Sequence, residues 1–492
     1  MITPKKIHEA NGARQLVTVT QRLTQIEKLT RELIERIGVF YQEEIDKQYV
    51  ESANLNSRIE LQTRRNPESG DVQSLAHQKA QLDKLIKPHQ QKNQAVLGAI
   101  VNQLINSRNS RRHLEIVLGT ILLNFPIDRR DSKFLSRIEI SKMLKPVYQS
   151  ALITLLFEQL VKEQHKFSSG YLAEQVEKIS HLDGEKAQEA LSELQKVFVE
   201  IIFIKEMGLF TPTALEILDS ADENNALAPE QRKALLVESR KGANEFHHYG
   251  IGPVDSLEPA EEPKRGAPAA QKPQGKEALE AQEAKRNEEE RLRRRYLQEQ
   301  ADRFAFIRDV LDPKQKQHAE IEELLKVCQV YTSFILSIKA KVDKEMHIKA
   351  YSAIEQHSQE KRLNPYFCEK LLQMMGRFPI GSGIYFIDER RNSIERGTVD
   401  KALVIGLNPD HPDEPIVKRV TTKYKYRMDA RVGTIDRTKN LYFEQARSPK
   451  LFTPELKKRF ATQYLNEDDP VHFSFRANEA FRTLSISEKS LW

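Results

Sequence analysis

The sequence is poor in cysteine, tryptophan and long apolar runs. Of its 492 residues two are cysteine and one is tryptophan, and no apolar run reaches the roughly 18 residues of a membrane-spanning helix. Cys328 and Cys368 stand inside apolar helical patterns without the spacing of a zinc site, so we expect buried free thiols in a reducing compartment. The opening residues, MITPKKIHEANGARQL, lack the apolar segment of a secretory signal. We therefore expect a cytoplasmic protein without a membrane segment.

The chain also lacks a strong excess of either charge. Lys and Arg number 77 against 71 Asp and Glu, which leaves a net charge of +6. Charged residues make up 30% of the chain and hydrophobic residues 39%, as is typical of a soluble protein with many helices. This balance permits weak attraction to phosphate groups, but it does not by itself indicate nucleic-acid binding.

An apolar stripe runs along the N-terminal segment at helical spacing. Charged residues occupy the opposite positions, which predicts an amphipathic helix within an N-terminal helical region over residues 1–92. Such a stripe packs against another helix, either in an intramolecular bundle or in a coiled-coil dimer, and the sequence favours the two equally. Self-association through these helices is therefore one expected contact. The stripe consists of Val19, Leu23, Ile26, Leu33, Ile37 and Phe40, with Thr30 at one seam position.

The remaining chain divides by composition. Apolar residues recur at helical spacing before 250 and again from 304 to 375, whereas 252–275 is rich in proline and charge without any aromatic residue. From Ile384 to Phe443, β-branched and aromatic residues alternate between turn signals, which predicts four or five antiparallel strands. We expect a mainly α-helical protein with a small antiparallel β module near the C-terminus. The expected order is a helical bundle over 93–250, a flexible linker and a solvated charged helix over 251–300, a second part of the bundle over 301–380, the β module over 381–445 and a polar tail over 446–492.

Separated segments of the chain resemble, in the right order, the HD-GYP subgroup of the HD superfamily. That family consists of helical metal-dependent phosphodiesterases that hydrolyse cyclic di-GMP. FIKEMGLFTP, from Phe203 to Pro212, is similar to a motif apolar-apolar-His-Asp-x-Gly-Lys followed by an apolar-Pro segment. LAPEQRKALLVESRKGANEF, over 227–246, resembles a Leu-Thr-Pro-Glu-Glu opening and the helix after it. A third segment, LLKVCQVY over 324–331, is similar to a helix of the family with Ala-Asp-Val-Tyr-Asp-Ala-Leu. A fourth, FPIGS over 378–382, is similar to the family's Tyr-Pro-x-Gly-Ser segment.

The matching positions do not carry the metal ligands of that family. The resemblance places Lys205 and Glu206 at the first His-Asp pair, and it places Glu238 at a later histidine and Gln329 at a metal-binding aspartate. A lysine repels a metal ion, and a glutamine is a weak neutral substitute for a carboxylate. Without a metal no water is activated. We therefore expect an HD-like bundle, interrupted by the linker, that holds no metal or other cofactor and does not hydrolyse phosphodiesters.

A histidine pair follows the second of these segments. The spacing of His247 and His248 is too short for the paired histidines of the family, and no Gly-Tyr-Pro continues it. We interpret them as two partly exposed histidines at a helix end. Both are candidate contacts for a ligand or a protein partner. An alternative function is an active phosphohydrolase with an altered metal set from Glu206, Glu238, His247 and His248.

A further alternative places function in the β module. Lys423, Tyr424 and Arg427 belong to a segment that alternates basic and aromatic residues, a pattern that can hold phosphates and stack bases. The stronger interpretation is a solvated sheet face whose tyrosines pack across strands. Nucleic-acid binding is therefore the less favoured function.

Taken together, the resemblance implies a catalytically inactive HD-GYP-like protein. Such a protein would act in bacterial signalling as a regulator or adaptor that binds a protein partner. A cyclic dinucleotide is the second ligand that the resemblance leaves open.

Overall fold

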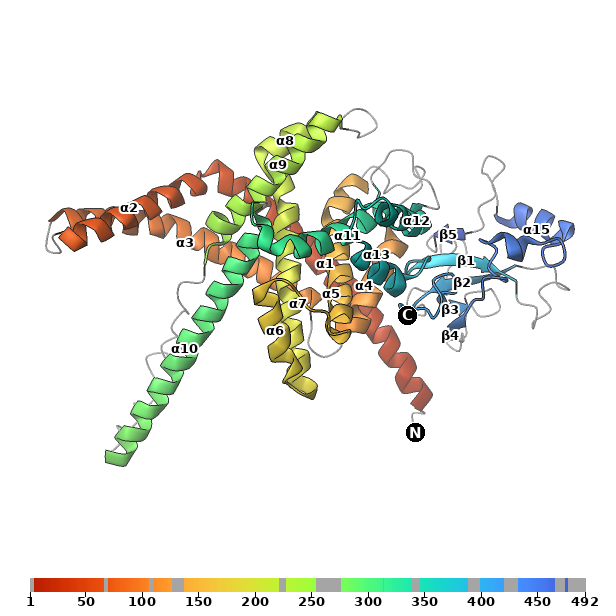
Figure 1. The fold of residues 1–492 in the computed structure, drawn as a ribbon, viewed down its shortest axis with the longest axis horizontal. Coiled ribbons are helices and arrows are strands. Elements are labelled where there is room, and N and C mark those ends of the chain that lie inside the picture. The colour runs from red at the N-terminus through yellow and green to blue at the C-terminus, as the bar shows by residue number, and fades with distance from the viewer. Residues whose placement is uncertain are drawn as a thin grey trace.

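The protein is mainly α-helical, with a small antiparallel sheet near the C-terminus, as the sequence predicts (Figure 1). Among the helices of the described ranges, none has a stretch both long and apolar enough to cross a membrane. The computed structural model describes residues 4–65, 70–105, 110–125, 137–220, 227–253, 276–312, 314–337, 346–387, 399–419, 432–464 and 474–476.

The N-terminal helices form one core helix and one projecting hairpin. Helix α1 (Pro4–Gln42) packs against the central helices of its own chain, while α2 (Ile45–Arg65) and α3 (Gly70–Leu104) lie side by side and extend from the body (Figure 1). Thr30 is fully buried and its hydroxyl donates a hydrogen bond to the Ile26 carbonyl over 2.8 Å. The predicted stripe is thus covered within the chain, which favours the intramolecular bundle. Its buried members are Val19, Leu23, Ile26, Leu33, Ile37 and Phe40.

The centre of the bundle is α5 (Arg137–Lys162). It packs against α4 (Ser110–Asn124), α7 (Gly184–Met207) and α11 (Ala319–Ile335). The residues from 146 to 158 on α5 are almost all buried because helices surround it on several sides. The other helices are α6 (Gly170–Ser180), η1 (Gly208–Phe210), α8 (Pro212–Asp219), α9 (Pro229–Glu245), the π-helix η2 (Phe246–Ile251), α10 (Lys276–Leu311), η3 (Lys316–His318), α12 (Met346–Gln359) and α13 (Pro365–Met375).

One hydrophobic core runs through these helices, from Val19 on α1 to Met375 on α13. Both cysteines lie in it as free thiols, as predicted. Most of the predicted flexible linker, 254–275, lies outside the described residues. The predicted charged helix forms the N-terminal part of α10, of which residues 286–296 are exposed.

The β module is a five-stranded antiparallel sheet with the order β4-β3-β2-β1-β5. Ile384 faces Ala402 on one side of the sheet and Tyr385 faces Lys401 on the other, and each side has its own small core. The fifth strand comes from the tail, beyond the range in which we predicted strands, because its three residues are too short to show an alternating pattern. The elements are β1 (Ser382–Phe386), β2 (Asp400–Val404), β3 (Ile416–Arg419), β4 (Val432–Thr434), η6 (Glu444–Arg447), α15 (Pro454–Tyr464) and β5 (Ser474–Arg476).

Candidate functional site

The end of α7 forms the centre of the candidate site. The helix stops at Met207 because Gly208 begins a tight turn and Pro212 starts α8. Thr211 caps α8, since its hydroxyl accepts a hydrogen bond from the Ala214 amide over 3.3 Å. The charged residues Lys205 and Glu206 therefore lie in the last turn of a buried helix.

Two glycines bring this turn and α9 into direct backbone contact. A Cβ on Gly208 would lie 1.9 Å from the Ser239 carbonyl oxygen, and a Cβ on Gly242 would lie 2.2 Å from the Thr211 Cγ2. Neither position has room for a side chain. The glycines of the two motif segments thus have a shared structural role, which is to pack the end of α7 against α9.

Polar side chains from four helices meet beside this contact. The Lys205 ammonium on α7 donates a hydrogen bond to the Gln329 Oε1 on α11 over 3.2 Å. The neighbouring Glu206 lies 3.9 Å from the Lys145 Nζ on α5. The set, which we call the α7 polar cluster, also includes an Arg240–Glu322 pair at 3.9 Å between α9 and α11.

Burial and crowding of positive charge dominate the electrostatics of the α7 polar cluster. Burial is the main cause that lowers the pKa of Lys205, and the nearby cations Arg240 and Lys145 lower it further. Glu206 and Glu322 act in the opposite direction and stabilise the ammonium. Three cations face two carboxylates and one amide here, so the cluster is suited to an anion rather than to a metal ion.

The cluster also reaches the surface of the protein. Glu206 is only 6% exposed, whereas the side chains of Arg240 and Glu322 are 43% and 39% exposed. A ligand could therefore approach from the α9 and α11 side and meet the lysines below it.

Glu238, the fourth position that the resemblance matched, is not part of this cluster. It is half-buried on another side of α9, on the side of Tyr41 of α1. Burial is the main cause that raises the pKa of Tyr41, and the carboxylates of Glu245 and Glu238 raise it further. The hydroxyl of Tyr41 donates to the Glu245 Oε2 over 3.3 Å. The structure thus brings together Lys205, Glu206 and Gln329, but it directs Glu238 towards α1.

The histidine pair lies in the π-helix η2 and corrects one interpretation from the sequence. We expected two partly exposed histidines, but His247 is 1% exposed and its ring stacks on Phe304 with centroids 4.3 Å apart. Burial, assisted by His248 and Arg308, lowers the pKa of His247 to about 3. His248 is half-buried between aromatic rings of Tyr49 and Tyr249. The apolar character of the surroundings could not be seen from the two histidines alone.

Side chains of α3 hold η2 in place. Gln90 donates to the Tyr249 carbonyl and Asn93 to the Gly250 carbonyl, each over 2.9 Å. Gln94 donates to the next carbonyl, that of Ile251, also over 2.9 Å. These amides satisfy the carbonyl groups that the end of a helix leaves free, and π-helices of this length are frequent at functional sites.

The candidate residues of the β module lie outside the described residues. This applies to Lys423, Tyr424 and Arg427. Of their basic neighbours, Lys418 is half-buried and its pKa is lowered by burial and by Arg112. Arg419 lies over the Phe386 ring at 5.0 Å. These two residues thus have contacts within the module.

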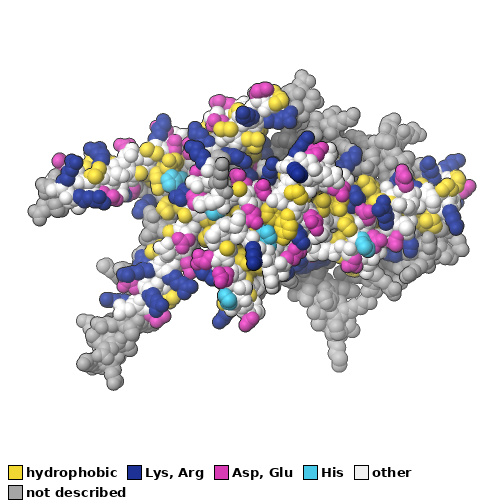
Figure 2. Space-filling model, viewed as in Figure 1, with side chains coloured by type: hydrophobic (Ala, Val, Ile, Leu, Met, Phe, Trp, Pro, Cys, Tyr) yellow, Lys and Arg dark blue, Asp and Glu magenta, His cyan; other side chains and the backbone are white. Residues whose placement is uncertain are grey.

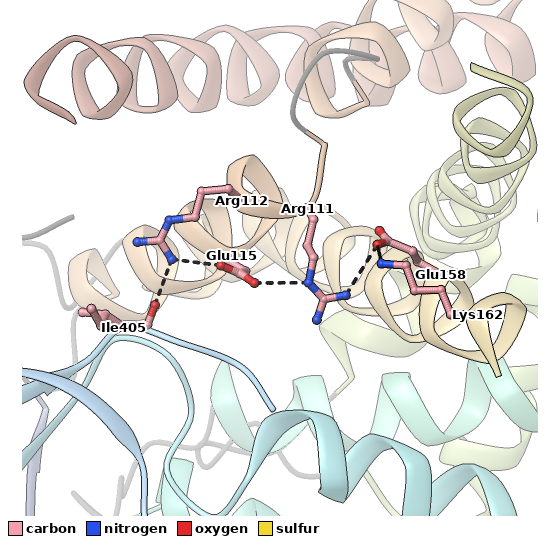
Figure 3. A network of polar contacts seen from close by, with 6 residues as sticks. All are labelled: Arg111, Arg112, Glu115, Glu158, Lys162 and Ile405. Atoms are coloured by element: carbon pink, nitrogen blue, oxygen red, sulfur yellow. Dashed lines mark hydrogen bonds and ion pairs between the residues drawn. The ribbon is translucent and has the colours of Figure 1, made fainter. Parts of the chain in front are cut away.

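A polar network fixes the β module to the helices (Figure 3). The Arg112 guanidinium on α4 donates to the Ile405 carbonyl after β2 over 3.1 Å, and the same nitrogen pairs with Glu115 at 2.9 Å. Close by, Gly381 has φ +91, and a Cβ there would lie 2.7 Å from the Gly119 carbonyl oxygen of α4. The module therefore rests directly on α4.

The same network continues from α4 into the core. Arg111 pairs with Glu115 and with Glu158 of α5, each at 3.5 Å, and Lys162 also pairs with Glu158 (Figure 3). Glu158 is 4% exposed, so its charge is stabilised chiefly by these two cations. The network is a structural joint between two parts of the fold.

Three members of the α7 polar cluster were missed by reasoning from the sequence, namely Lys145, Arg240 and Glu322. Arg240 is two residues after Glu238, a spacing that points to the opposite side of a helix. Glu322 is seven residues before Gln329, and two turns of helix place both on one face. That second spacing is a signal that could have identified Glu322.

Within the described ranges, no group of three or more His, Cys, Asp or Glu side chains is placed to hold a metal ion. Comparison of the chain with protein-family models, with curated proteins and with solved structures finds no match.

Proposed function

We propose that the protein is a non-hydrolytic regulator or adaptor of the HD-GYP type, with the α7 polar cluster as its ligand site. The observation that carries this proposal is the hydrogen bond between Lys205 and Gln329. The resemblance assigned these two positions to metal ligands of one active site, and they lie in contact although they come from different helices. On this proposal the protein acts in the cytoplasm, in bacterial signalling.

The chemistry of the cluster supports binding without hydrolysis. A lysine and a glutamine occupy the positions that would hold a metal, and neither can activate a bridging water. The cations Lys145, Lys205 and Arg240 are instead suited to the oxygens of a phosphate ester. We infer that a cyclic dinucleotide is the ligand, and that its binding alters contacts with a protein partner.

The test is calorimetric titration of the full chain with cyclic di-GMP, together with metal analysis and a hydrolysis assay. We expect saturable binding without turnover. Lys205→Met should weaken the affinity by about tenfold or more, because a charged hydrogen bond contributes about 1.5–3 kcal/mol. The control is Lys178→Met, which removes an exposed lysine of α6 and should leave the affinity unchanged.

Two results would contradict the proposal. Turnover of cyclic di-GMP with stoichiometric iron or manganese would show an active phosphohydrolase with an altered metal set. Equal loss of binding in Lys205→Met and Lys178→Met would place the ligand elsewhere. Titration with inorganic phosphate separates recognition of the phosphate group from recognition of the whole nucleotide.

A further inference from the structure

Helices α8 and α9 pack against each other and project from the bundle (Figure 1). One side of α9 holds this hairpin in place, since Ser239, Gly242 and Ala243 are buried against the turn that follows α7. The opposite side of α9 faces water. Figure 2 shows hydrophobic side chains exposed among charged ones on this hairpin.

Two large apolar side chains lie on the water-facing side of α9. Leu236 is 58% exposed and Val237 is 57% exposed. Single exposed apolar residues are common on protein surfaces and need no explanation. Among the large exposed apolar side chains of the described residues, however, these two form the one pair of sequence neighbours. They therefore make a small continuous apolar surface on a projecting helix.

Basic side chains border this apolar pair at both ends. Lys233 lies one turn before Leu236 and Val237, and Arg240 and Lys241 lie one turn after them. Residues three and four apart are neighbours on the surface of a helix, so the five side chains share one face. All five are exposed. We call this set the α9 basic face.

The α9 basic face carries a net positive charge. Among the residues of α9, all of which the structure describes, Glu230 is the carboxylate on this side. It lies in the first turn, where a helix favours negative charge. Glu238 and Glu245 lie on the side of α9 that faces Tyr41 of α1. Three cations thus stand against one carboxylate of the same helix.

Two of these cations have long ion pairs within the chain. Arg240 lies 3.9 Å from Glu322 of α11, and Lys241 lies 3.9 Å from Glu245. The side chains of Arg240 and Lys241 are 43% and 64% exposed. Exposed pairs contribute little to stability. Both cations can therefore turn to an external carboxylate at low cost.

An apolar centre with a basic rim fits an acidic protein segment better than it fits other anions. Protein interfaces have a small apolar centre with polar groups around it. A lipid surface takes up a helix with an extended apolar face, whereas α9 exposes only two large apolar side chains. Nucleic acid would gain from the cations, but it has no use for an aliphatic pair.

We propose that the α9 basic face is the docking surface for a protein partner, which presents an amphipathic helix with carboxylates on both sides of an apolar strip. Leu236 and Val237 pack against the apolar strip. Lys233 and Lys241 pair with the carboxylates at the two ends of the contact. The charge of the rim selects an acidic segment and rejects a basic one.

Arg240 belongs both to the α9 basic face and to the α7 polar cluster, where it pairs with Glu322. A phosphate group held in the cluster draws this guanidinium away from the carboxylates of the partner. Ligand and partner therefore oppose each other, and the effect is reciprocal. This link rests on the proposed function, whereas the docking surface does not.

The experiment measures the binding of fluorescently labelled helical peptides to the full chain by fluorescence anisotropy. The acidic peptide has leucines at alternating spacings of three and four residues, with glutamates between them. The basic peptide has the same leucines, with lysines in place of the glutamates. We expect saturable binding of the acidic peptide that weakens as salt is added, and no binding of the basic peptide.

Two double variants test the rim and the centre separately. Lys233→Glu with Lys241→Glu should weaken binding of the acidic peptide by about tenfold or more, and it should create binding of the basic peptide. Leu236→Ser with Val237→Ser should also weaken binding of the acidic peptide by about tenfold or more, because the apolar centre is lost. It should create no binding of the basic peptide.

Matched controls come from other helices. Leu61→Ser removes a leucine of α2 that is 57% exposed. Lys47→Glu with Lys178→Glu reverses two exposed lysines on α2 and α6. Both controls should leave the affinity for the acidic peptide unchanged. Circular dichroism confirms that each variant keeps its helix content.

Addition of cyclic di-GMP tests the link to the α7 polar cluster. A saturating concentration should weaken binding of the acidic peptide. If calorimetry shows that the nucleotide binds but the peptide affinity does not change, the link is wrong. If the nucleotide does not bind at all, the proposed function fails, and binding of the acidic peptide still decides the docking surface.

Three results would overturn the docking surface. The first is no saturable binding of the acidic peptide in low salt. The second is equal affinity for this peptide in the unchanged chain and in both double variants, since the contact would then lie elsewhere. The third is co-sedimentation with phosphatidylserine vesicles that Leu236→Ser with Val237→Ser abolishes, without binding of the acidic peptide, because that pattern indicates a lipid surface.

Discussion

Lys205 and Gln329 are 124 positions apart in the sequence, yet the Nζ of the first donates a hydrogen bond of 3.2 Å to the Oε1 of the second. The contact joins α7 to α11 through two half-buried side chains. Both residues occupy motif positions in the sequence. Their contact is the geometry on which the proposed ligand site depends.

The first prediction concerns the energy of this pair. Lys205→Met, Gln329→Leu and the double variant form a double-mutant cycle, and chemical denaturation gives the free energy of unfolding of each. We expect a coupling energy of about 1–2 kcal/mol, because the donor is charged and partly buried. The control cycle combines Lys205→Met with Gln94→Leu, whose side chain contacts η2, and should be additive within about 0.5 kcal/mol. Equal coupling in both cycles would contradict the contact.

The second prediction concerns the glycine at the end of α7. Gly208→Ala should destabilise the protein by about 3 kcal/mol or more, because its Cβ would lie 1.9 Å from a backbone oxygen that cannot move away. Gly98→Ala on α3 is the matched control, since nothing lies within 4 Å of its Cβ position. That variant should be neutral or stabilising by up to about 1 kcal/mol. Thermal unfolding distinguishes the two, and similar midpoints would refute the close packing.

The third prediction is a loss of stability in acid. The pKa of His247 is about 3 in the folded protein against 6.5 for the ordinary side chain. The unfolded chain therefore binds more protons between these values, so stability is full above about pH 6.5 and falls as the pH decreases. At about pH 5 the loss should be roughly 2 kcal/mol.

The variant His247→Gln should remove this part of the acid dependence, as measured by denaturation at a series of pH values. Buried His113, with a pKa lowered to about 4 mainly by burial, contributes a similar slope that the variant keeps. His77→Gln on the exposed face of α3 is the control. An unchanged slope in His247→Gln would mean that the ring is not buried as described.

The fourth prediction concerns the joint between α4 and the β module. Arg112→Met removes the donor to the Ile405 carbonyl and should weaken the joint by about 1–3 kcal/mol. Hydrogen exchange should become faster in β2 and β3, while α6 stays unchanged. Arg232→Met is the control, because it removes a comparable bond to the Leu227 carbonyl on an exposed helix. Faster exchange throughout the protein would indicate general destabilisation rather than a specific joint.

Periodicity predicted the parts of the fold in which one face of an element is buried. The stripe on α1 is such a case, because the spacing of Leu23, Ile26 and Phe40 places them on one side of a helix whatever they pack against. The helices before 380 and the strands β1 to β4 after it followed from the same patterns. The fifth strand did not, since its three residues have no pattern of their own and are ordered by pairing with β1.

The candidate site was only partly visible in the sequence, for a related reason. Motif positions identified Lys205 and Gln329, but their neighbours come from helices whose rotation the sequence does not specify. Glu238 and Arg240 lie on the same helix, and packing against α7 decided that Arg240 would join the cluster. The burial of His247 depends on Phe304, which is far along the chain.

The position of β5 has a consequence for how the chain is made. Strand β1 lies between β2 and β5, and the described residues that cover its second edge are 474–476 at Ser382–Ile384 and 439–441 beyond Tyr385. During synthesis, the ribosome releases β1 to β4 well before 474–476. In that interval the first half of this edge, at Ser382–Ile384, presents amide and carbonyl groups that can pair with another nascent chain. Shortening the protein at its end would make that temporary exposure permanent, and such a product should accumulate as aggregates in the cell.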